Sequence, residues 1–428
     1  MAPEAAALGE VALEVQEPAA AAPPIKSLWR DGNFNLFWLS QAFDAIGDSF
    51  ARISMPLLVL EFSGSVSEMG RVTALMGLAS LLAGITSSLF IDLLDRRRLL
   101  MLCDFGRVLV YGLVPLSILM LGKTMWPVYV VAAVSGYLNS VFFIGMSAAI
   151  PGLVDEQHLL SANGRIQGTV GLSFVLGPML AGLAAGLLGP RLSIGIVALL
   201  YGSSLVLMAL VRMRAKSAAE LEAASKKGPF MEELLSGVRF MMAHPVLKWA
   251  AILFALSALL SEAAIDLAIF RLEHELRLSK TAIGVVFGIA SLGAVLAGVL
   301  AQLLRRRWGF GACFLGSILV QGVAIVGLGN TFDLWTGVMA AMLFTFGFML
   351  RNINTMSLRQ QVTPAHLLGR VSAAFWTVIA VMGPVGAVLA TSLAEENGAA
   401  PVLMGMGVLG AMVAAAGLFT PARTREVK

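Results

Sequence analysis

Several ionisable side chains interrupt otherwise apolar stretches of this sequence. The first stretch carries Asp44, Asp48 and Arg52 at intervals of four residues, which places all three on one face of a helix. A later stretch carries Glu262 and Asp266 at the same interval. A charged side chain at the centre of a membrane costs about 2.5–3.5 kcal/mol on insertion scales, so these residues indicate a functional site by default.

Two carboxylates on one helix face repel each other, and partial burial favours the binding of a proton by one of them. Such a group can take up a proton on one side of a membrane and release it on the other, or it can bind a cationic substrate. We expect Asp48 or Asp266 to carry the proton, whereas Asp44 serves either this role or substrate binding. The alternative is a set of static ion pairs, either Asp48 with Arg52 or Asp44 with Arg351. Arg52 is expected to be structural, as a partner that keeps an aspartate ionised.

Other polar residues lie in further apolar stretches. Arg351 is followed by Asn354, and Asp104 and Arg107 are expected to form a local or inter-helix ion pair. The four His residues are scattered without ligand spacing, and the chain has no phosphate-binding, zinc-protease or hydrolase motif. We therefore expect no metal, no cofactor and no catalytic residue, and the chain is not expected to be an enzyme.

The composition is that of a membrane protein. Of the 428 residues, 58% are hydrophobic and 13% are charged, and the mean hydropathy is +0.85. Soluble domains average about 45–50% apolar and about 25% charged residues, so a soluble enzyme, a nucleic-acid-binding protein and a disordered scaffold are excluded. The net charge of +4 is therefore assigned to loops beside a lipid bilayer, with no nucleic acid as partner.

Apolar windows of about 20 residues predict an all-α integral membrane protein with twelve transmembrane helices. The longest polar insert, 213–245, separates six helices from six, and apolar residues at helical spacing in its second half predict an interfacial helix. The expected domains are a disordered cytoplasmic tail (1–30), a six-helix bundle (31–212), a cytoplasmic linker (213–245), a second six-helix bundle (246–420) and a cytoplasmic tail (421–428). The predicted helices cover 34–60, 67–91, 99–121, 126–150, 164–188, 191–212, 246–271, 281–304, 310–329, 332–358, 369–394 and 400–420.

Charge and repetition extend this prediction. Most of the 30 Lys and Arg residues fall on the side of the N-terminus, which places both termini in the cytoplasm under the positive-inside rule. The halves also repeat, since Gly70 and Gly284 are each followed by the triplet Leu-Ala-Gly and then by three arginines. The segments that start at His158 and His366 both begin His-Leu-Leu and both reach a Gly-Pro pair. Two parallel six-helix repeats with a site between them are typical of carriers.

With these motifs in view, the chain resembles the major facilitator superfamily, and within it the branch of macrolide-efflux and enterobactin-exporter proteins. The segment Ser87–Arg98 is similar to the signature of the loop between the second and third helices, with Asp92, Arg96 and Arg97 in place. The pair Gly177-Pro178 is similar to the antiporter signature of exporting members. The branch also matches at the following positions: Pro151–Asn163, Gly237–Pro245, Pro364, Gly369, Arg370, Gly383 and Pro384.

The resemblance implies a fold of two pseudo-symmetric six-helix bundles, with the first, fourth, seventh and tenth helices around a central path. It implies a monomeric secondary transporter of the cytoplasmic or inner membrane that exports an amphipathic small molecule such as an antibiotic, a siderophore or another secondary metabolite. Protons are the expected coupling ion. Uptake of a substrate and transport of a lysophospholipid by the same fold stay open as alternatives. Asp92 is expected to latch one face of the carrier, and the Gly-Pro pairs are expected to kink their helices or allow close packing.

Overall fold

The computed structural model describes residues 28–91, 95–154, 158–213, 230–364 and 367–425, and over these ranges the chain is helical without strands. The expected N-terminal tail lies outside the described residues except for a short 3-10 turn, Leu28–Arg30. Residues 214–229 of the expected linker lie outside them as well. The fold predicted from the sequence, an all-α membrane protein with twelve spans, is confirmed.

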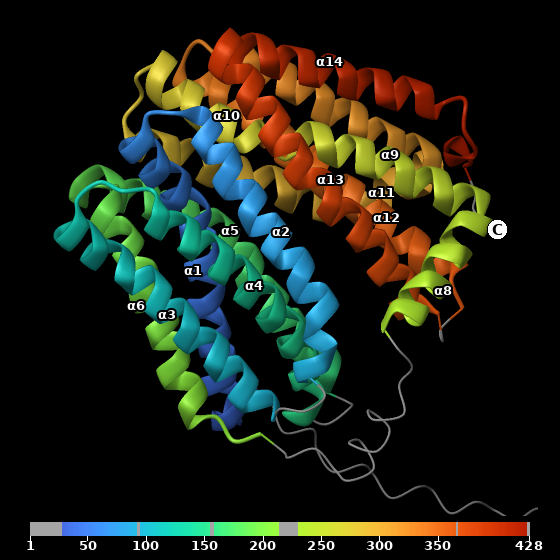
Figure 1. Ribbon diagram of the computed structural model, residues 1–428. Helices are drawn as coiled ribbons and strands as arrows, with labels where there is room; N and C mark the ends of the chain where they lie inside the picture. The colour runs from blue at the N-terminus through green and yellow to red at the C-terminus, as the bar shows by residue number, and fades with distance from the viewer. Residues whose placement is uncertain (1–27, 92–94, 155–157, 214–229, 365–366, 426–428) are drawn as a thin grey trace, which may run out of the picture.

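Each of the first six spans is a single helix (Figure 1). Their bounds differ from the predicted ones by a few residues, and the largest difference is that α5 begins at Leu159, well before the predicted residue 164. They are α1 (Gly32–Ser63), α2 (Val66–Ile91), α3 (Arg96–Leu121), α4 (Trp126–Ala149), α5 (Leu159–Leu188) and α6 (Pro190–Leu210).

The second six spans are less regular. The predicted seventh helix is split into α9 (Pro245–Ser261) and α10 (Ala264–Phe270), and a π-helical turn continues α10 to Glu275. The predicted eighth and ninth helices form one element, α11 (Lys280–Gly329), in which Gly309 takes a positive φ of 80° and turns the chain back. The remaining helices are α12 (Leu334–Val362), α13 (Leu368–Asn397) and α14 (Ala399–Gly417), and the amphipathic helix α8 (Phe230–Ala243) precedes α9.

Most helices of the described residues are long enough to cross a membrane. Ten of its helices are long and apolar enough to cross a bilayer. Helix α1 is not among these ten, because its charged residues lower its mean hydropathy. Helix α11 is counted once, although it crosses the membrane twice. With α1 and the second pass of α11 the described residues supply the twelve spans expected.

Local signals in the sequence set several helix ends. The Asp31 carboxylate accepts hydrogen bonds from the amides of Asn33 and Phe34 at 2.9 and 3.1 Å, so it caps the start of α1. Gly64 ends α1 in the left-handed conformation with φ 64°, which costs glycine nothing. Asp333 opens α12 with a reciprocal capping box. In this capping box the Thr336 amide donates to the Asp333 carboxylate, and this hydrogen bond lowers the pKa of the Asp333 carboxyl.

The internal repeat is visible in the backbone. Gly189 joins α5 to α6 with φ 81° and ψ 157°, and Gly398 joins α13 to α14 with φ 84° and ψ 157°. The Gly-Pro pairs lie against corresponding helices: a Cβ atom on Gly177 of α5 would clash with Ser49 of α1, and one on Gly383 of α13 would make an ordinary contact with Glu262 beside α9. The two Gly-Pro pairs therefore contact corresponding helices of the two halves, but only Gly177 is a close approach.

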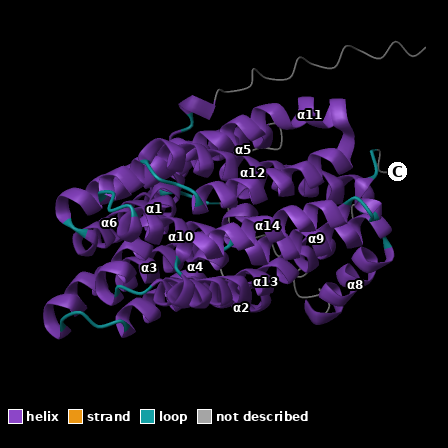
Figure 2. Cartoon of the chain, turned by 90° about the horizontal axis from the view of Figure 1, so that it is seen from above, coloured by secondary structure: helices purple, strands orange, loops and turns teal. Residues whose placement is uncertain are grey.

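The two halves meet along two seams, where α2 packs on α13 and α5 packs on α11. Seen from above (Figure 2), these seams lie on opposite sides of α1 and α10. In Figure 1 the halves touch near the labels α1 and α10 and diverge toward the end of the molecule that bears α8. Hydrogen bonds and an ion pair join described residues of the two halves between mid-span and the end remote from α8. This remote end is closed, and we call it the outer end.

Glycine permits the closure of the α5–α11 seam. A Cβ atom on Gly284 would collide with the backbone of Pro178 and Gly182, neither of which can rotate away. Gly298 lies on the same helix, and a Cβ atom there would meet nothing within 4 Å.

We expect Gly284→Val to reduce transport at least about tenfold, because overpacking of a tight helix crossing costs about 1–3 kcal/mol. The matched control is Gly298→Val, which should transport within about twofold of the wild type. Both variants are compared for amount in the membrane and for initial transport rate. Equal rates for the two would show that the close approach at the seam is not needed.

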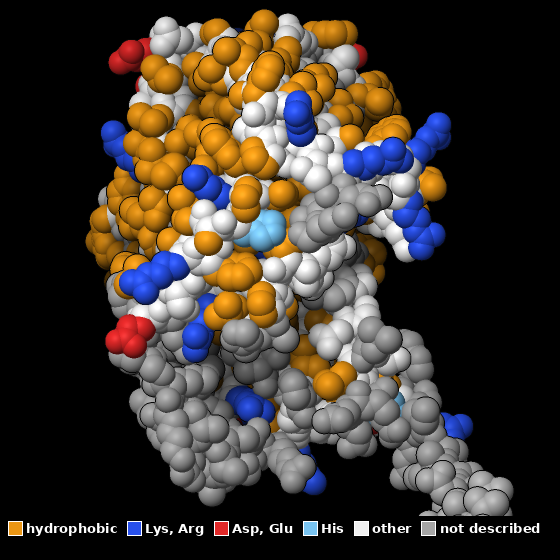
Figure 3. All heavy atoms as spheres, turned by 90° about the vertical axis from the view of Figure 1, so that its right-hand side faces the viewer, with side chains coloured by type: hydrophobic (Ala, Val, Ile, Leu, Met, Phe, Trp, Pro, Cys, Tyr) orange, Lys and Arg blue, Asp and Glu red, His pale blue; other side chains and the backbone are white. Residues whose placement is uncertain are grey.

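Basic side chains mark the other end of the molecule. Figure 3 views the side that bears α8 and the C-terminus, where Lys and Arg side chains are more evident than Asp and Glu side chains and a broad hydrophobic surface lies above them. Arg306, Arg307 and Arg239 belong to this end and are exposed. We call it the inner end.

Candidate functional site

The polar centre of the first half is built around Arg107 on α3. Its Nη2 atom donates to Asp44 Oδ1 on α1 at 2.6 Å and also to Oδ1 of Asp104, one turn away on α3. Its Nη1 atom donates to Asn139 Oδ1 on α4 at 3.0 Å and lies 3.7 Å from Asp48 Oδ1. One guanidinium therefore joins three carboxylates and three helices.

Aromatic and hydroxyl groups complete this centre. The Arg107 guanidinium lies 4.2 Å from the ring centroids of both Phe142 on α4 and Tyr201 on α6. The Tyr201 hydroxyl donates to Asp48 at 2.6 Å, and the Ser204 hydroxyl donates to Asp104 at 2.8 Å. The guanidinium is fully buried beside these two rings, so the carboxylates and not water balance its charge.

The three carboxylates differ in exposure. The side chain of Asp104 is fully buried and that of Asp44 is 8% exposed, whereas that of Asp48 is 37% exposed. Asp48 is also the carboxylate farthest from the guanidinium. It is therefore the member of the group that solvent or a solute reaches first.

The polar centre of the second half is built around Arg351 on α12. This side chain is 1% exposed, and its Nη1 atom donates to Gln321 Oε1 on α11 at 2.7 Å and to the hydroxyl of Ser257 on α9. Its guanidinium lies 4.2 Å from the ring of Phe254 and 5.4 Å from the ring of Phe348. Within the described residues this arginine forms no ion pair shorter than 4.0 Å, in contrast to Arg107.

Glu262 connects the two halves electrostatically. It lies in the turn between α9 and α10, its side chain is exposed, and it interacts with the charges of Arg52 on α1 and Arg351 on α12. Arg52 is exposed too, and its guanidinium lies 5.4 Å from the ring of Phe174 on α5. Two exposed opposite charges from opposite halves thus lie close enough to interact electrostatically.

Asp266 joins the halves directly. Its carboxylate is 4% exposed and accepts a hydrogen bond of 2.7 Å from the Thr73 hydroxyl on α2. The spacing of Glu262 and Asp266 predicted that both lie on one face of a continuous helix, and this prediction is wrong. The helix is interrupted between Ser261 and Ala264, so one carboxylate is exposed while the other is buried at the interface.

The ion pairs considered from the sequence are replaced by others. Asp44 pairs with Arg107 and not with Arg351, and Asp48 lies near Arg107 and not within an ion pair to Arg52. The expected pair of Asp104 with Arg107 is present, and it belongs to the larger group. Spacing along one helix identified the acids but not their partner, which lies on a neighbouring helix.

Other candidate residues take structural places. The Asn354 amide donates to the Leu350 carbonyl of its own helix at 2.8 Å, so it does not extend toward the other half. Arg97 Nε donates to the Met208 carbonyl at 3.3 Å near the end of α6, and Arg96 lies beside Gly152. Asp92 lies outside the described residues, so its expected latch stays a prediction.

Two further candidates adjoin the inner end of α13. A Cβ atom on Gly237 of α8 would clash with the Arg370 carbonyl oxygen, so α8 packs closely against the first turn of α13. Gly369 is exposed, and a Cβ atom there would meet no atom within 4 Å.

Sequence reasoning missed the residues that complete the two centres and the partner of Asp266: Asn139, Tyr201, Ser204, Ser257 and Gln321 in the centres, and Thr73 at the interface. Each is a polar residue inside an apolar helix, which is the signal that could have found them. Their partners were not deducible, because they lie between 30 and 193 residues away in the sequence.

Two repeated six-helix halves, closed at one end and carrying polar groups between them at mid-span, define a transport protein of the membrane. The sequence profile of the Major Facilitator Superfamily matches residues 37–387. The chain belongs to this superfamily, and it is a transporter and not an enzyme.

Two relatives of known function are efflux proteins. The chain is 24% identical over 390 residues to the multidrug efflux pump Tap of Mycolicibacterium fortuitum, an alignment that covers 89% of this chain and 93% of Tap. It is also 24% identical over 390 residues to the enterobactin exporter EntS of Shigella boydii, with 88% and 90% covered. Among solved structures, the nucleoside transporter NupG superimposes with a TM-score of 0.75 at 12% identity over 91% of this chain and 98% of NupG, which shows the fold alone.

Proposed function

We propose that this chain exports an amphipathic small molecule from the cytoplasm by alternating access, in exchange for protons. The observation that carries the proposal is the group of Asp44, Asp48 and Asp104 around the single guanidinium of Arg107. Three carboxylates and one guanidinium leave two negative charges unbalanced when all are ionised. Because such charges are costly away from water, the group favours the binding of a proton.

Asp48 has the properties of the proton carrier within this group. It is the most exposed of the three acids, and Tyr201 holds its orientation through a hydrogen bond of 2.6 Å. Binding of a proton to Asp48 removes a negative charge that lies 3.7 Å from Arg107. Arg107 then forms ion pairs with Asp44 and Asp104 only. A change of charge at the junction of α1, α3 and α6 then alters how these helices pack.

Export of a drug-like or siderophore-like substrate is supported by the relatives, which include a multidrug efflux pump and an enterobactin exporter. Exposed aromatic side chains between mid-span and the inner end suit an amphipathic molecule, among them Phe348 at 42% and Trp376 at 47% exposed.

The test is expression in a bacterium deprived of its own efflux pumps, challenged with a macrolide, a catecholate siderophore and ethidium. We expect lower accumulation of at least one compound and a severalfold gain in resistance to it. Arg107→Met provides the inactive control. Higher accumulation in cells with the wild-type chain would indicate uptake and refute export.

We further propose that the inner end, with both termini, faces the cytoplasm, because basic side chains gather there (Figure 3). Lys123→Cys at the outer end should react with an impermeant maleimide added to intact cells, and Arg306→Cys at the inner end should not. Both native cysteines, Cys103 and Cys313, are buried and give a low background. The reverse labelling pattern would refute this orientation.

A further inference from the structure

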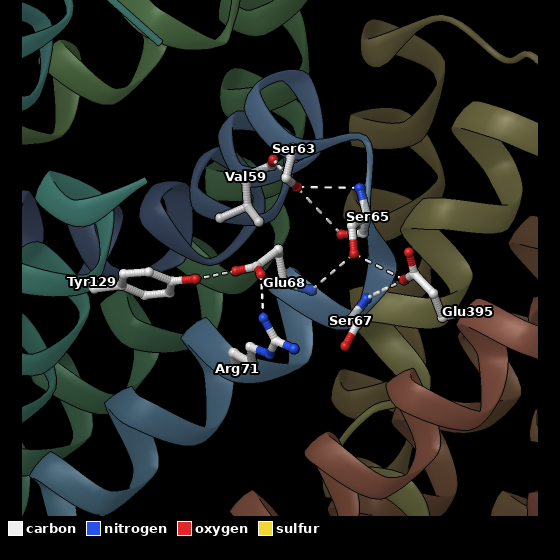
Figure 4. A network of polar contacts seen from close by, with 8 residues as sticks. All are labelled: Val59, Ser63, Ser65, Ser67, Glu68, Arg71, Tyr129 and Glu395. Atoms are coloured by element: carbon white, nitrogen blue, oxygen red, sulfur yellow. Dashed lines mark hydrogen bonds and ion pairs between the residues drawn. The ribbon is translucent and has the colours of Figure 1, made fainter. Parts of the chain in front are cut away.

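A carboxylate of the second half caps a helix of the first half at the outer end (Figure 4). Glu395, in the last turn of α13, accepts a hydrogen bond of 2.8 Å from the Ser65 hydroxyl and one of 2.9 Å from the Ser67 amide. Ser65 directly precedes α2, and Ser67 lies in its first turn. Glu395 therefore occupies the place of an anion at the start of α2.

The start of a helix is a favourable place for a negative charge. Its first amides lack partners within the helix, and the helix dipole has its positive end there. The Ser65 hydroxyl also accepts from the Glu68 amide at 3.3 Å, a bond within the first half that persists in any arrangement of the halves. The bonds to Glu395 exist only while the α2–α13 seam is closed.

The ion pair across the outer end is of a different kind. Lys280 of α11 lies 3.4 Å from Glu61 of α1, but Glu61 is also 3.1 Å from Arg191 of its own half. Lys280 in turn lies 3.9 Å from Glu273 of its own half. Each of these charges keeps a partner when the halves separate, so the pair resists opening only weakly.

Glu395 keeps no such partner. Over the ranges that the structure describes, its two hydrogen-bond donors both belong to the first half. Below this contact the seam is lined by small groups, with Gly70 against Thr391 and Gly77 against Pro384, which separate without loss of hydrogen bonds. The polar free energy lost when α2 leaves the second half is therefore held by Glu395 at the start of α2 and by the Thr73–Asp266 hydrogen bond one to two turns further along the helix.

We propose that Glu395 is the gating carboxylate of the outer end, and that its capping of α2 sets the balance between the outer-closed and outer-open states of the carrier. This inference rests on the proposed alternating-access cycle. Its test requires neither substrate nor a proton gradient, so it is independent of the proposed substrate and coupling ion.

The experiment measures the outer-end distance in full-length protein reconstituted in lipid. Labels are placed on Lys123→Cys in the first half and Phe332→Cys in the second, both exposed outer positions. We expect Glu395→Gln to raise the outer-open population about fivefold to tenfold, as for loss of a helix cap. Glu396→Gln is the matched control, since Glu396 is exposed on the next position and makes no hydrogen bond or ion pair with the described residues.

A double substitution separates gating from a general effect of charge. Ser65→Ala removes the hydroxyl donor to Glu395, so Glu395→Gln should change the population less in that background than in the wild type. Melting temperatures of the variants show whether each is folded. The proposal is overturned if Glu395→Gln and Glu396→Gln give the same outer-open population. It is also overturned if the effects of Ser65→Ala and Glu395→Gln are additive.

Discussion

Replacing Arg107 by methionine is expected to abolish transport and to lower the stability of the protein strongly. The guanidinium is the shared partner of Asp44 and Asp104, and its removal leaves buried carboxylates without a counter-charge. Loss of one member of a buried ion pair costs about 3–5 kcal/mol. Melting temperature in detergent and transport in vesicles measure the two effects.

Two variants make this prediction specific. Arg107→Lys keeps the charge but loses both the forked donors and the stacking on the two rings, so it should rescue stability in part and transport little. Lys123→Met removes an exposed cation just beyond the end of the same helix and should leave both quantities unchanged. Wild-type stability and transport in Arg107→Met would contradict the assignment of this residue as the organising cation.

Replacing Asp48 by asparagine is expected to uncouple transport from the proton gradient. Uphill efflux should fall at least about tenfold, while downhill exchange of substrate persists, because the path and the motion of the halves are intact. Stability should change little, since Asp44 and Asp104 still balance Arg107. Efflux and exchange are measured in the same vesicles.

The same assay on the other acids separates carriers from partners. Asp104→Asn should lower the amount of folded protein, because Asp104 is a fully buried partner of Arg107. Asp44→Asn, Glu262→Gln and Asp266→Asn complete the series. If every one of these variants keeps gradient-driven efflux at the wild-type rate, the acids are static ion pairs and proton exchange through them is wrong.

The fold was predictable because a bilayer imposes a length and a polarity on each span. Windows of about 20 apolar residues located the helices, and the repeat of Gly70 and Gly284 indicated two equivalent halves. The interruption between Ser261 and Ala264 was not predictable, because the surrounding residues are as apolar as those of the intact helices. Such breaks depend on packing between helices, which a single sequence does not record.

The site was predictable in its acids but not in its geometry. Asp44 and Asp48 were identified by their spacing in an apolar helix, whereas their common partner Arg107 was expected to form a local or inter-helix ion pair with Asp104 and was not connected with them. The partner depends on which face α3 turns toward α1, and no pattern along one chain fixes that rotation. Glu395 gave no signal at all, since an acid near a helix end is ordinary.

The most direct test of proton-coupled export is transport into everted membrane vesicles under an imposed pH gradient, with no ATP present. The compound found in the accumulation assay should move uphill into wild-type vesicles only when their interior is acidic. A protonophore should abolish this movement, and Asp48→Asn vesicles should lack it. Uphill movement that is unaffected by the gradient, or equal in wild-type and Asp48→Asn vesicles, would contradict the proposed function.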